Sequence, residues 1–189
     1  MAGVAGQYVP LATYLAAERD VPYRHEYVGG MIYAMTGGTA AHNLTSQALS
    51  RAMYSTGRKQ NCQTYVSDMK VKVDDLHVYY PDVMVVCDPQ SLDPYLQTTP
   101  CLIAEVLSPS TRHTDLREKR SLYVTIPTLR AYLLIDVDDR WVEVYGRGPE
   151  GVGWVSTLFH SGDDITLDCP KATFAVDDLF VDLDENARR

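Results

Sequence analysis

The chain lacks the features that mark secreted, membrane-spanning or strongly basic proteins. Its first residues, MAGVAGQYVPLATYL, have neither the basic start nor the long apolar core of a secretory signal, and no apolar run approaches the ~20 residues that cross a membrane. These absences predict a cytoplasmic protein. The 17 Lys and Arg residues are outnumbered by 25 Asp and Glu residues, for a formal net charge of −8. Nucleic-acid binders usually carry a basic surface, so this balance argues against tight, non-specific binding of nucleic acid, but it leaves room for a local basic patch.

Cysteine is also sparse, and its spacing is uninformative. The four cysteines, Cys62, Cys87, Cys101 and Cys169, lie far apart in the chain, and none forms a C-x-x-C pair. Zinc sites and disulfide frameworks usually show closer or more regular spacing. We therefore expect neither, and predict reduced, buried thiols.

What is present is the composition of an ordinary globular domain. Hydrophobic residues make up 46% and charged residues 22% of the 189 positions, with no internal repeat or low-complexity tract. These values predict one domain over residues 1–189.

Periodicity and turn residues predict helices and strands that alternate along the chain. Apolar residues at helical spacing predict helices over 10–18 and 41–55, and a third that begins at Thr114 or Asp115 and ends before Pro127. A hairpin over 21–35 would turn at the Gly29-Gly30 pair. The other strands are expected over 65–73, 78–87, 101–107, 131–136, 141–145, 154–159 and 165–167. The first two of these would pair as an antiparallel hairpin, the last three would form a meander, and 174–183 would close the fold. Helices and strands mixed around one sheet indicate an α/β (α+β) class.

Two of the apolar strands each contain a single acid. Asp82 lies in VYYPDVMVV and Glu105 in CLIAEVL, and a carboxylate buried in an apolar strand is costly unless it is paired or bound to a metal. A proline-aspartate pair alone more often marks a turn, but Glu105 downstream favours a site for both acids. Glu105 has no convincing structural explanation, because it would be a buried charge without a partner. Two carboxylates fit magnesium, which binds few protein carboxylates and keeps several waters.

The helix after Glu105 places a lysine among apolar positions. At about 100° per residue, Lys119 lies near the middle of a stripe that includes Leu116, Leu122, Tyr123 and Ile126, so we expect it to face the sheet. The alternative is that its ammonium extends past the apolar stripe into water. Asp115, followed three residues later by Glu118, matches a capping box at the start of this helix.

Five blocks in order give the chain its strongest resemblance. They are HEYVGG at 25–30, AHN at 41–43, YYPDVMVV at 79–86, EVLSPST at 105–111, and DLREK followed by tyrosine over 115–123. With this order of elements the chain resembles the PD-(D/E)XK nuclease superfamily and, more closely, its Uma-two family of restriction endonuclease-like proteins. The resemblance covers residues 8 to 146. It implies a restriction-endonuclease-like core with a central mixed sheet in αβββαβ order, an N-terminal helix and hairpin, and a C-terminal antiparallel meander.

The resemblance also implies a metal-dependent endonuclease that hydrolyses phosphodiester bonds, with DNA as the expected substrate. Asp82, Glu105 and the backbone carbonyl of Val106 would hold Mg²⁺ or Mn²⁺. The superfamily's usual lysine position is Leu107 here, so Lys119 from the following helix would orient the attacking water or neutralise the transition state.

Further residues are assigned with their alternatives. Glu26 is either a surface strand residue beside Arg24 or a further acid of the site, and His42 either packs its helix or contacts the substrate. Basic side chains beside the expected site, which could bind phosphate, are Arg112, Arg117 and Arg120.

Two other functions stay open, as does the assembly. A catalytically silent nuclease fold could serve as an interaction or DNA-binding module, and a related metal hydrolase could act on a smaller phosphoester. The resemblance implies a homodimer, which aromatic residues expected on the meander surface also favour. They are Tyr132, Trp141, Tyr145, Trp154 and Phe159.

Overall fold

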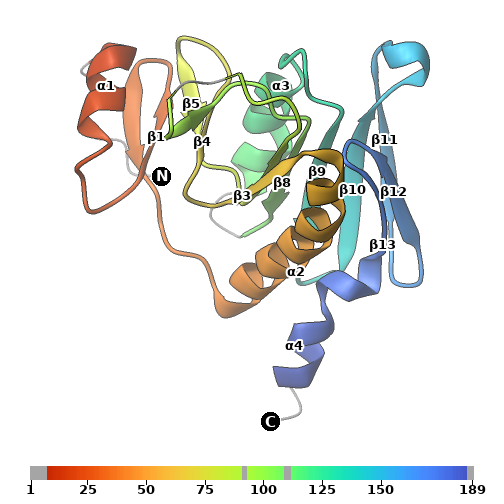
Figure 1. Ribbon diagram of the computed structural model, residues 1–189. Coiled ribbons are helices and arrows are strands. Elements are labelled where there is room, and N and C mark those ends of the chain that lie inside the picture. Colours follow the sequence, from red (N-terminus) through yellow and green to blue (C-terminus); the bar gives the residue numbers. More distant parts are fainter. Residues whose placement is uncertain (1–7, 91–92, 109–111, 187–189) are drawn as a thin grey trace.

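A six-stranded sheet forms the centre of the structure, a computed structural model that describes residues 8–90, 93–108 and 112–186 (Figure 1). Its strand order is β11-β10-β9-β8-β6-β3. In chain order the strands are β3 (Gln63–Val66), β6 (Val83–Val86), β8 (Leu102–Val106), β9 (Ala131–Asp136), β10 (Trp141–Arg147) and β11 (Trp154–Phe159). All neighbours are antiparallel except β8 and β9, which run parallel. The predicted α+β class with a central mixed sheet is confirmed.

Helices cover both faces of this sheet, as predicted by the apolar runs of β8 and β9, in which Glu105 and Asp136 are the only acids. On one face α2 (Ala40–Gly57) packs through Leu49 and Met53. On the other face η2 (Thr114–Lys119), a π-helix, continues into α3 (Arg120–Tyr123), whose Tyr123 is fully buried. These two segments form the crossover that two parallel strands require.

A second sheet carries the N-terminal part of the chain. Its order is β2-β1-β5-β4-β7, with β1 (His25–Val28), β2 (Met31–Ala34), β4 (Lys70–Lys72), β5 (His77–Tyr79) and β7 (Leu96–Gln97). The β1–β2 turn uses Gly29 and Gly30, whose φ angles are +60° and +84°, as predicted. The short helix α1 (Leu11–Ala17) packs against this sheet by stacking Tyr14 on Tyr27, with ring centroids 5.0 Å apart.

The long hairpin expected over 65–73 and 78–87 divides between the two sheets. Its inner halves β4 and β5 pair in the second sheet, whereas its outer halves β3 and β6 pair in the central sheet. The chain bends at Ser67, whose φ is +46° and whose N–H donates to the carbonyl of Asp82 at 3.1 Å. The antiparallel pairing is confirmed, but the continuous strands were wrong. The bend puts Asp82 where the two sheets meet.

The C-terminal meander is also divided. β10 and β11 extend the central sheet, but β12 (Asp164–Asp168) pairs only with β13 (Lys171–Ala175), as a separate hairpin over the α2 side of the core (Figure 1). After it come η4 (Val176–Leu179) and α4 (Val181–Asn186); two 3₁₀ turns, η1 (Arg58–Gln60) and η3 (Pro149–Gly151), lie earlier in the chain. Within the described ranges no helix is both long and apolar enough to cross a membrane.

The cysteines differ from the prediction of reduced thiols. Two disulfides join Cys62 to Cys87 and Cys101 to Cys169. Their spacing gave no signal because each bond joins segments that only the folded sheet brings together.

The aromatic residues of the meander do not form an exposed patch. Tyr132 is fully buried, and the other four are half-buried. Arginines lie over three of these rings: Arg112 over Trp141, Arg120 over Tyr145 and Arg147 over Trp154, at 5.7, 4.7 and 4.3 Å from the ring centroids. The surface argument for a homodimer therefore loses its basis.

Candidate active site

Strand register brings the two predicted acids together. Asp82 directly precedes β6, and Glu105 lies near the end of β8, whose Ala104 pairs with Val83. The backbone N–H of Val106 donates to Asp82 Oδ2 at 2.7 Å, which ties the two strand ends at the site. The Asp82 carboxylate is thus held by a backbone group of the neighbouring strand.

Lys119 lies inside the protein between three carboxylates. Its Nζ is 3.0 Å from Glu26 Oε1, 3.2 Å from Glu105 Oε1 and 3.2 Å from Asp115 Oδ1. The lysine is only 5% exposed, so the alternative in which its ammonium reaches water is excluded. The apolar stripe of the helix therefore faces the sheet as expected, and Arg117, Glu118, Ser121 and Thr125 are exposed.

Asp115 has a different place from the one predicted. It is 1% exposed and points at Lys119 four residues later, and His113, which precedes η2, makes no side-chain capping bond. The capping-box assignment was therefore wrong. Six residues in a row are π-helical here, and such wide turns occur often at functional sites.

Glu26 reaches the site from the N-terminal hairpin. It lies on β1 of the second sheet, is 7% exposed and contacts Lys119. The alternative of a surface residue is excluded by this burial. Arg24, its expected partner, pairs instead with Asp68, at 2.8 Å.

The charges of the site are shifted by burial and by one another. Burial raises the pKa of Glu105 well above its usual range, and the neighbouring acids Asp115, Asp82 and Glu26 raise it further, although Lys119 opposes them. Burial works against the charge of Lys119, but the carboxylates of Glu105 and Glu26 outweigh it and raise the lysine's pKa. The neighbouring carboxylates raise both pKa values, whereas burial raises that of Glu105 and opposes the rise for Lys119.

Two aromatic hydroxyls and an imidazole complete the cluster. The Tyr123 hydroxyl donates to Glu105 Oε1 at 3.0 Å, and the Tyr132 hydroxyl donates to the carbonyl of Asp115 at 3.1 Å. His42, in the first turn of α2, places Nε2 3.1 Å from Asp82 Oδ2. The hydrogen bond with Asp82 raises the pKa of His42, against the effect of burial. His42 thus contacts the site acid, which favours a site role over simple helix packing.

The donor set fits a hard divalent cation. Four carboxyl groups, from Asp82, Glu105, Glu26 and Asp115, lie together with one lysine, Lys119, and one histidine, His42, so acidic groups outnumber basic groups. Among the described residues, no donor forms a hydrogen bond to Glu26 Oε1 or Asp115 Oδ1, which are both buried; their contacts with Lys119 are ion pairs. Carboxylate oxygens with unmet bonding capacity are suitable ligands for Mg²⁺ or Mn²⁺.

The cluster forms the floor of a cleft of about 580 Å³. The walls come from the hairpin after α1, the segment before α2 and the bend at Ser67. The lining residues include Tyr23, Arg24, Met35, His42, Asp68, Tyr80 and Ser108. Among the lining side chains of the described residues, Arg24 and Lys119 are the only lysine or arginine.

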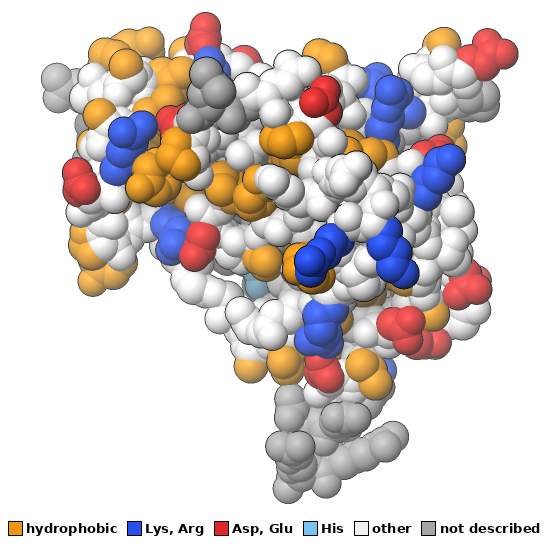
Figure 2. Space-filling view, viewed as in Figure 1, with side chains coloured by type: hydrophobic (Ala, Val, Ile, Leu, Met, Phe, Trp, Pro, Cys, Tyr) orange, Lys and Arg blue, Asp and Glu red, His pale blue; other side chains and the backbone are white. Residues whose placement is uncertain are grey.

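The predicted phosphate-binding arginines are not brought to this cleft. Arg112 pairs with Asp136, Arg120 donates to the Tyr145 hydroxyl, and Arg117 is exposed outside the cleft lining. On the face seen in Figure 2, Lys and Arg side chains are scattered and form no continuous track. Their role in substrate binding stays a prediction.

Sequence reasoning missed two residues of the site. Asp115 is four residues before Lys119, the helical spacing at which an acid and a base meet, and that spacing was the available signal. Arg24 gave no signal, because only the folding of the N-terminal hairpin onto the bend brings it to the cleft.

Comparison with known proteins agrees with this architecture. The family Uma2, described as "Putative restriction endonuclease", matches residues 11–176. The crystal structure of "a putative nuclease belonging to DUF820" from Anabaena variabilis ATCC 29413 has a TM-score of 0.73 at 16% identity, over 92% of this chain and 98% of that one, and so shows a shared fold.

Two relatives come from Synechocystis sp. (strain ATCC 27184 / PCC 6803 / Kazusa). The uncharacterized protein slr1290 is 34% identical over 169 residues, which cover 88% of each chain. The uncharacterized protein sll1609 is 37% identical over 140 residues, 72% of this chain and 79% of that protein. With the family match over most of its length and this level of identity, the chain belongs to the Uma2 family of restriction endonuclease-like proteins.

Proposed function

We propose that this protein is a metal-dependent endonuclease that hydrolyses phosphodiester bonds in nucleic acid, with DNA as its substrate. The observation that carries the proposal is the cluster at the cleft: three buried carboxylates around Lys119, with Asp82 and its partner His42 beside them. A buried excess of negative charge costs stability, so it is better explained by a function that uses it. Family membership and the fold support a nuclease.

Asp82 and Glu105 are the proposed metal ligands, with the backbone carbonyl of Val106. Both hydrogen bonds to Asp82 described above go to Oδ2, from His42 and from the Val106 N–H, and they fix the direction of the carboxylate. Tyr123 and Lys119 fix Glu105 through Oε1. A bound Mg²⁺ or Mn²⁺ would stabilise charge on the phosphoryl group and lower the pKa of an attacking water.

Lys119 is the proposed electrostatic residue. Its ammonium is held by Glu26, Glu105 and Asp115, and its raised pKa keeps it charged at neutral pH. A fixed positive charge next to the metal ligands can orient the water or stabilise the transition state without moving first. Glu26 and His42 are proposed as positioning residues for Lys119 and Asp82.

The cleft limits how nucleic acid can bind. Its volume of about 580 Å³ is in the range of small-ligand pockets, so it holds a nucleotide or two, and a duplex would lie across its mouth. The acidic lining supplies little attraction for phosphate, so a bound cation must neutralise part of it before the backbone approaches.

The same acidity favours the second candidate, a catalytically silent module that binds a partner. Cleavage assays separate the two functions. We expect Mg²⁺- or Mn²⁺-dependent cleavage of DNA that Asp82→Asn and Glu105→Gln each abolish, and that Asp75→Asn leaves unchanged. Asp75 is an exposed acid paired with Lys72 in the β4–β5 turn and serves as the matched control.

The outcomes of this assay are distinct. Cleavage that persists equally in both site variants would show a contaminant or another site. Calorimetric metal binding that is lost in Glu105→Ala, without cleavage of DNA or RNA by the wild-type protein, would favour the silent module. Metal binding that ignores Glu105 would contradict the metal-dependent mechanism.

The proposal includes a homodimer, so that two sites can cut two strands. Since the aromatic surface is largely buried, the better contact is the edge strand β11, on which Val155 and Leu158 are each 51% exposed. Light scattering that gives a monomer mass at tens of micromolar protein would remove this part of the proposal.

A further inference from the structure

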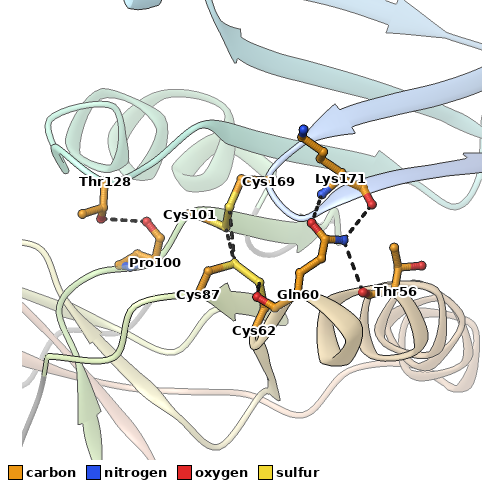
Figure 3. Close-up of a disulfide and its surroundings, with 9 residues drawn as sticks. All are labelled: Thr56, Gln60, Cys62, Cys87, Pro100, Cys101, Thr128, Cys169 and Lys171. Atoms are coloured by element: carbon orange, nitrogen blue, oxygen red, sulfur yellow. Dashed lines mark hydrogen bonds between the residues drawn. A yellow bond between two sulfur atoms is a disulfide. The ribbon is translucent and has the colours of Figure 1, made fainter.

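All four cysteines of the chain meet at one point, at the end of the central sheet away from the cleft (Figure 3). The disulfide partners Cys62 and Cys87 are opposite each other, one step beyond the Gln63–Val86 pair of β3 and β6. Cys101 directly precedes β8 and its N–H donates to the carbonyl of Val85. Cys169 comes from the β12–β13 turn.

The two disulfides are in contact with each other. Cys87 Sγ is 3.5 Å from Cys101 Sγ and 3.4 Å from Cys169 Sγ, and the sulfurs of these three residues all lie within 4.8 Å of one another. Two independent disulfides require only that each pair be close. The fourth sulfur, of Cys62, is bonded to that of Cys87 and so lies next to this group. Four neighbouring sulfurs are what a tetrahedral metal site requires, because Zn–S bonds of about 2.3 Å give sulfur–sulfur distances of about 3.8 Å.

We infer that these four cysteines, when reduced, form a structural site for one soft divalent cation, Zn²⁺. Two molecules of a dithiol reduce the two disulfides to four cysteine thiols and are themselves oxidised to two cyclic disulfides. Zn²⁺ then binds the four sulfurs as thiolates, and four protons are released to solvent. Four protein ligands leave no open position, so the site would have a structural role and would not be catalytic.

Contacts other than the disulfides hold the four sulfurs in place. The Gln60 side chain donates to the carbonyls of Lys171 and Thr56, at 2.9 and 3.3 Å, and accepts from the Lys171 N–H at 3.0 Å (Figure 3). This clamp joins the end of α2 to the β12–β13 turn next to Cys169. The arrangement of ligands would therefore survive reduction.

The surroundings suit a closed zinc site. Cys62 and Cys101 are buried in the core on the α2 side, and Cys87 and Cys169 are half-buried against it. Arg130 lines the same hollow as Cys169, and its backbone N–H donates to the carbonyl of Cys101, so a basic residue borders the cysteines. The cation would fasten the β12–β13 hairpin, which has no strand partner in the central sheet, to the end of that sheet.

The test uses the full chain, reduced with a dithiol and then freed of reductant without oxygen. We expect one Zn²⁺ per chain, and with Co²⁺ the thiolate-to-metal absorption that carboxylate ligands cannot give. Protein with both disulfides intact should give neither. Cys169→Ser should lower zinc affinity by more than the roughly 10- to 100-fold that loss of an outer partner costs. Thr173→Ala, an exposed change on the same hairpin, should have no effect.

Three results would overturn the inference. The first is reduced wild-type protein that gives no thiolate absorption with Co²⁺, a measurement that needs no variant to fold. The second is an affinity for Zn²⁺ that Cys169→Ser and Cys62→Ser leave unchanged. The third is that both disulfides stay intact in excess dithiol.

Discussion

The two ends of one strand pair carry opposite chemistry. β6 follows Asp82 and precedes Cys87, and β8 follows Cys101 and carries Glu105 near its end. Because β6 and β8 are antiparallel, the oxygens gather at one end of the pair and the sulfurs at the other. The oxygen end is open to a cleft, has excess charge and leaves carboxylate atoms without hydrogen bonds. The sulfur end is covalently closed and packs into the core.

Under the proposed function, this difference separates catalysis from stability within a single pair of strands. The proposed metal ligands border an open cleft, and buried carboxylate oxygens without hydrogen bonds lie beside them. Groups that hold the fold together are satisfied by bonds within the chain. Changes at the two ends should therefore have opposite consequences.

The largest expected effects come from one variant at each end of the strand pair, since one should lose cleavage and the other should lose stability. Glu105→Gln should abolish cleavage and be at least as stable as wild type, because a neutral amide replaces a carboxyl whose ionised form is disfavoured by burial, and it keeps an acceptor for Tyr123. Cys169→Ser in the oxidised protein should keep cleavage and lose roughly 2–4 kcal/mol of unfolding free energy. DNA cleavage and urea unfolding measure the two properties.

One outcome would contradict the assignment of catalysis to the oxygen end and stability to the sulfur end. If Cys169→Ser abolished cleavage while its unfolding midpoint stayed at the wild-type value, the sulfur end would have a role in the reaction.

The sequence predicted the paired acids and Lys119 because those inferences depend on local rules. Asp82 and Glu105 each interrupt an apolar strand, and the 3.6-residue period put Lys119 on the buried face of its helix. It failed at Cys62 and Cys87, which are 25 residues apart and meet only through the register of β3 and β6. Chain spacing carries no information on such contacts.

The predictions for Asp115 and for the long hairpin failed for another reason, since a local rule competed with a tertiary contact. An acid three residues before Glu118 fits a cap, but burial against Lys119 determined its position. An alternating strand over 65–73 fits a single ladder, but the bend at Ser67 separates it into two sheets. Both failures fall at the candidate site, where local preference and function conflict.

The next largest effect is expected on the cleavage rate, when one of two buried lysines is replaced. Lys70 and Lys119 are each 5% exposed, but Lys70 lies by the Tyr80 hydroxyl, at 3.3 Å, and burial lowers its pKa. Lys119→Met should slow cleavage by roughly 100-fold, the scale of one lost transition-state donor. Lys70→Met is the matched control and should leave the rate unchanged. Circular dichroism must show both variants folded, because Lys119→Met also leaves three acids without their cation.

A double variant tests whether the position of the lysine charge is what cleavage requires. Leu107 is buried, two residues from Glu105 and on the same side of β8, so Leu107→Lys in the Lys119→Met background returns a lysine beside Glu105. Partial recovery of the rate would show that the position of the charge is what cleavage requires. A full rate in Lys119→Met alone would end the assignment of Lys119.

The smallest expected effect is a pH dependence of Mg²⁺ affinity at the oxygen end. The pKa of Glu105 is raised above its usual range by burial and by Asp115, Asp82 and Glu26, so the metal-free protein holds a proton there at pH values where an exposed glutamate has lost it. Mg²⁺ requires the ionised carboxylate, and its binding should therefore release this proton. Affinity for Mg²⁺ should rise by up to about tenfold per pH unit until the folded pKa of Glu105 is passed, and then level off.

Stability without metal should change in the opposite direction. The folded pKa of Glu105 lies above its unfolded value, so the stability that its proton contributes is complete below the unfolded pKa and is lost as pH rises through the folded one. Calorimetry in buffers of different ionisation enthalpy counts the released protons, and urea unfolding over the same pH range measures stability. Glu105→Gln should remove both slopes and leave zinc binding by the reduced cysteines unchanged. An affinity for Mg²⁺ that does not vary with pH, with no proton released, would show that Glu105 is already ionised over that range and would contradict a pKa raised by burial and by the neighbouring acids.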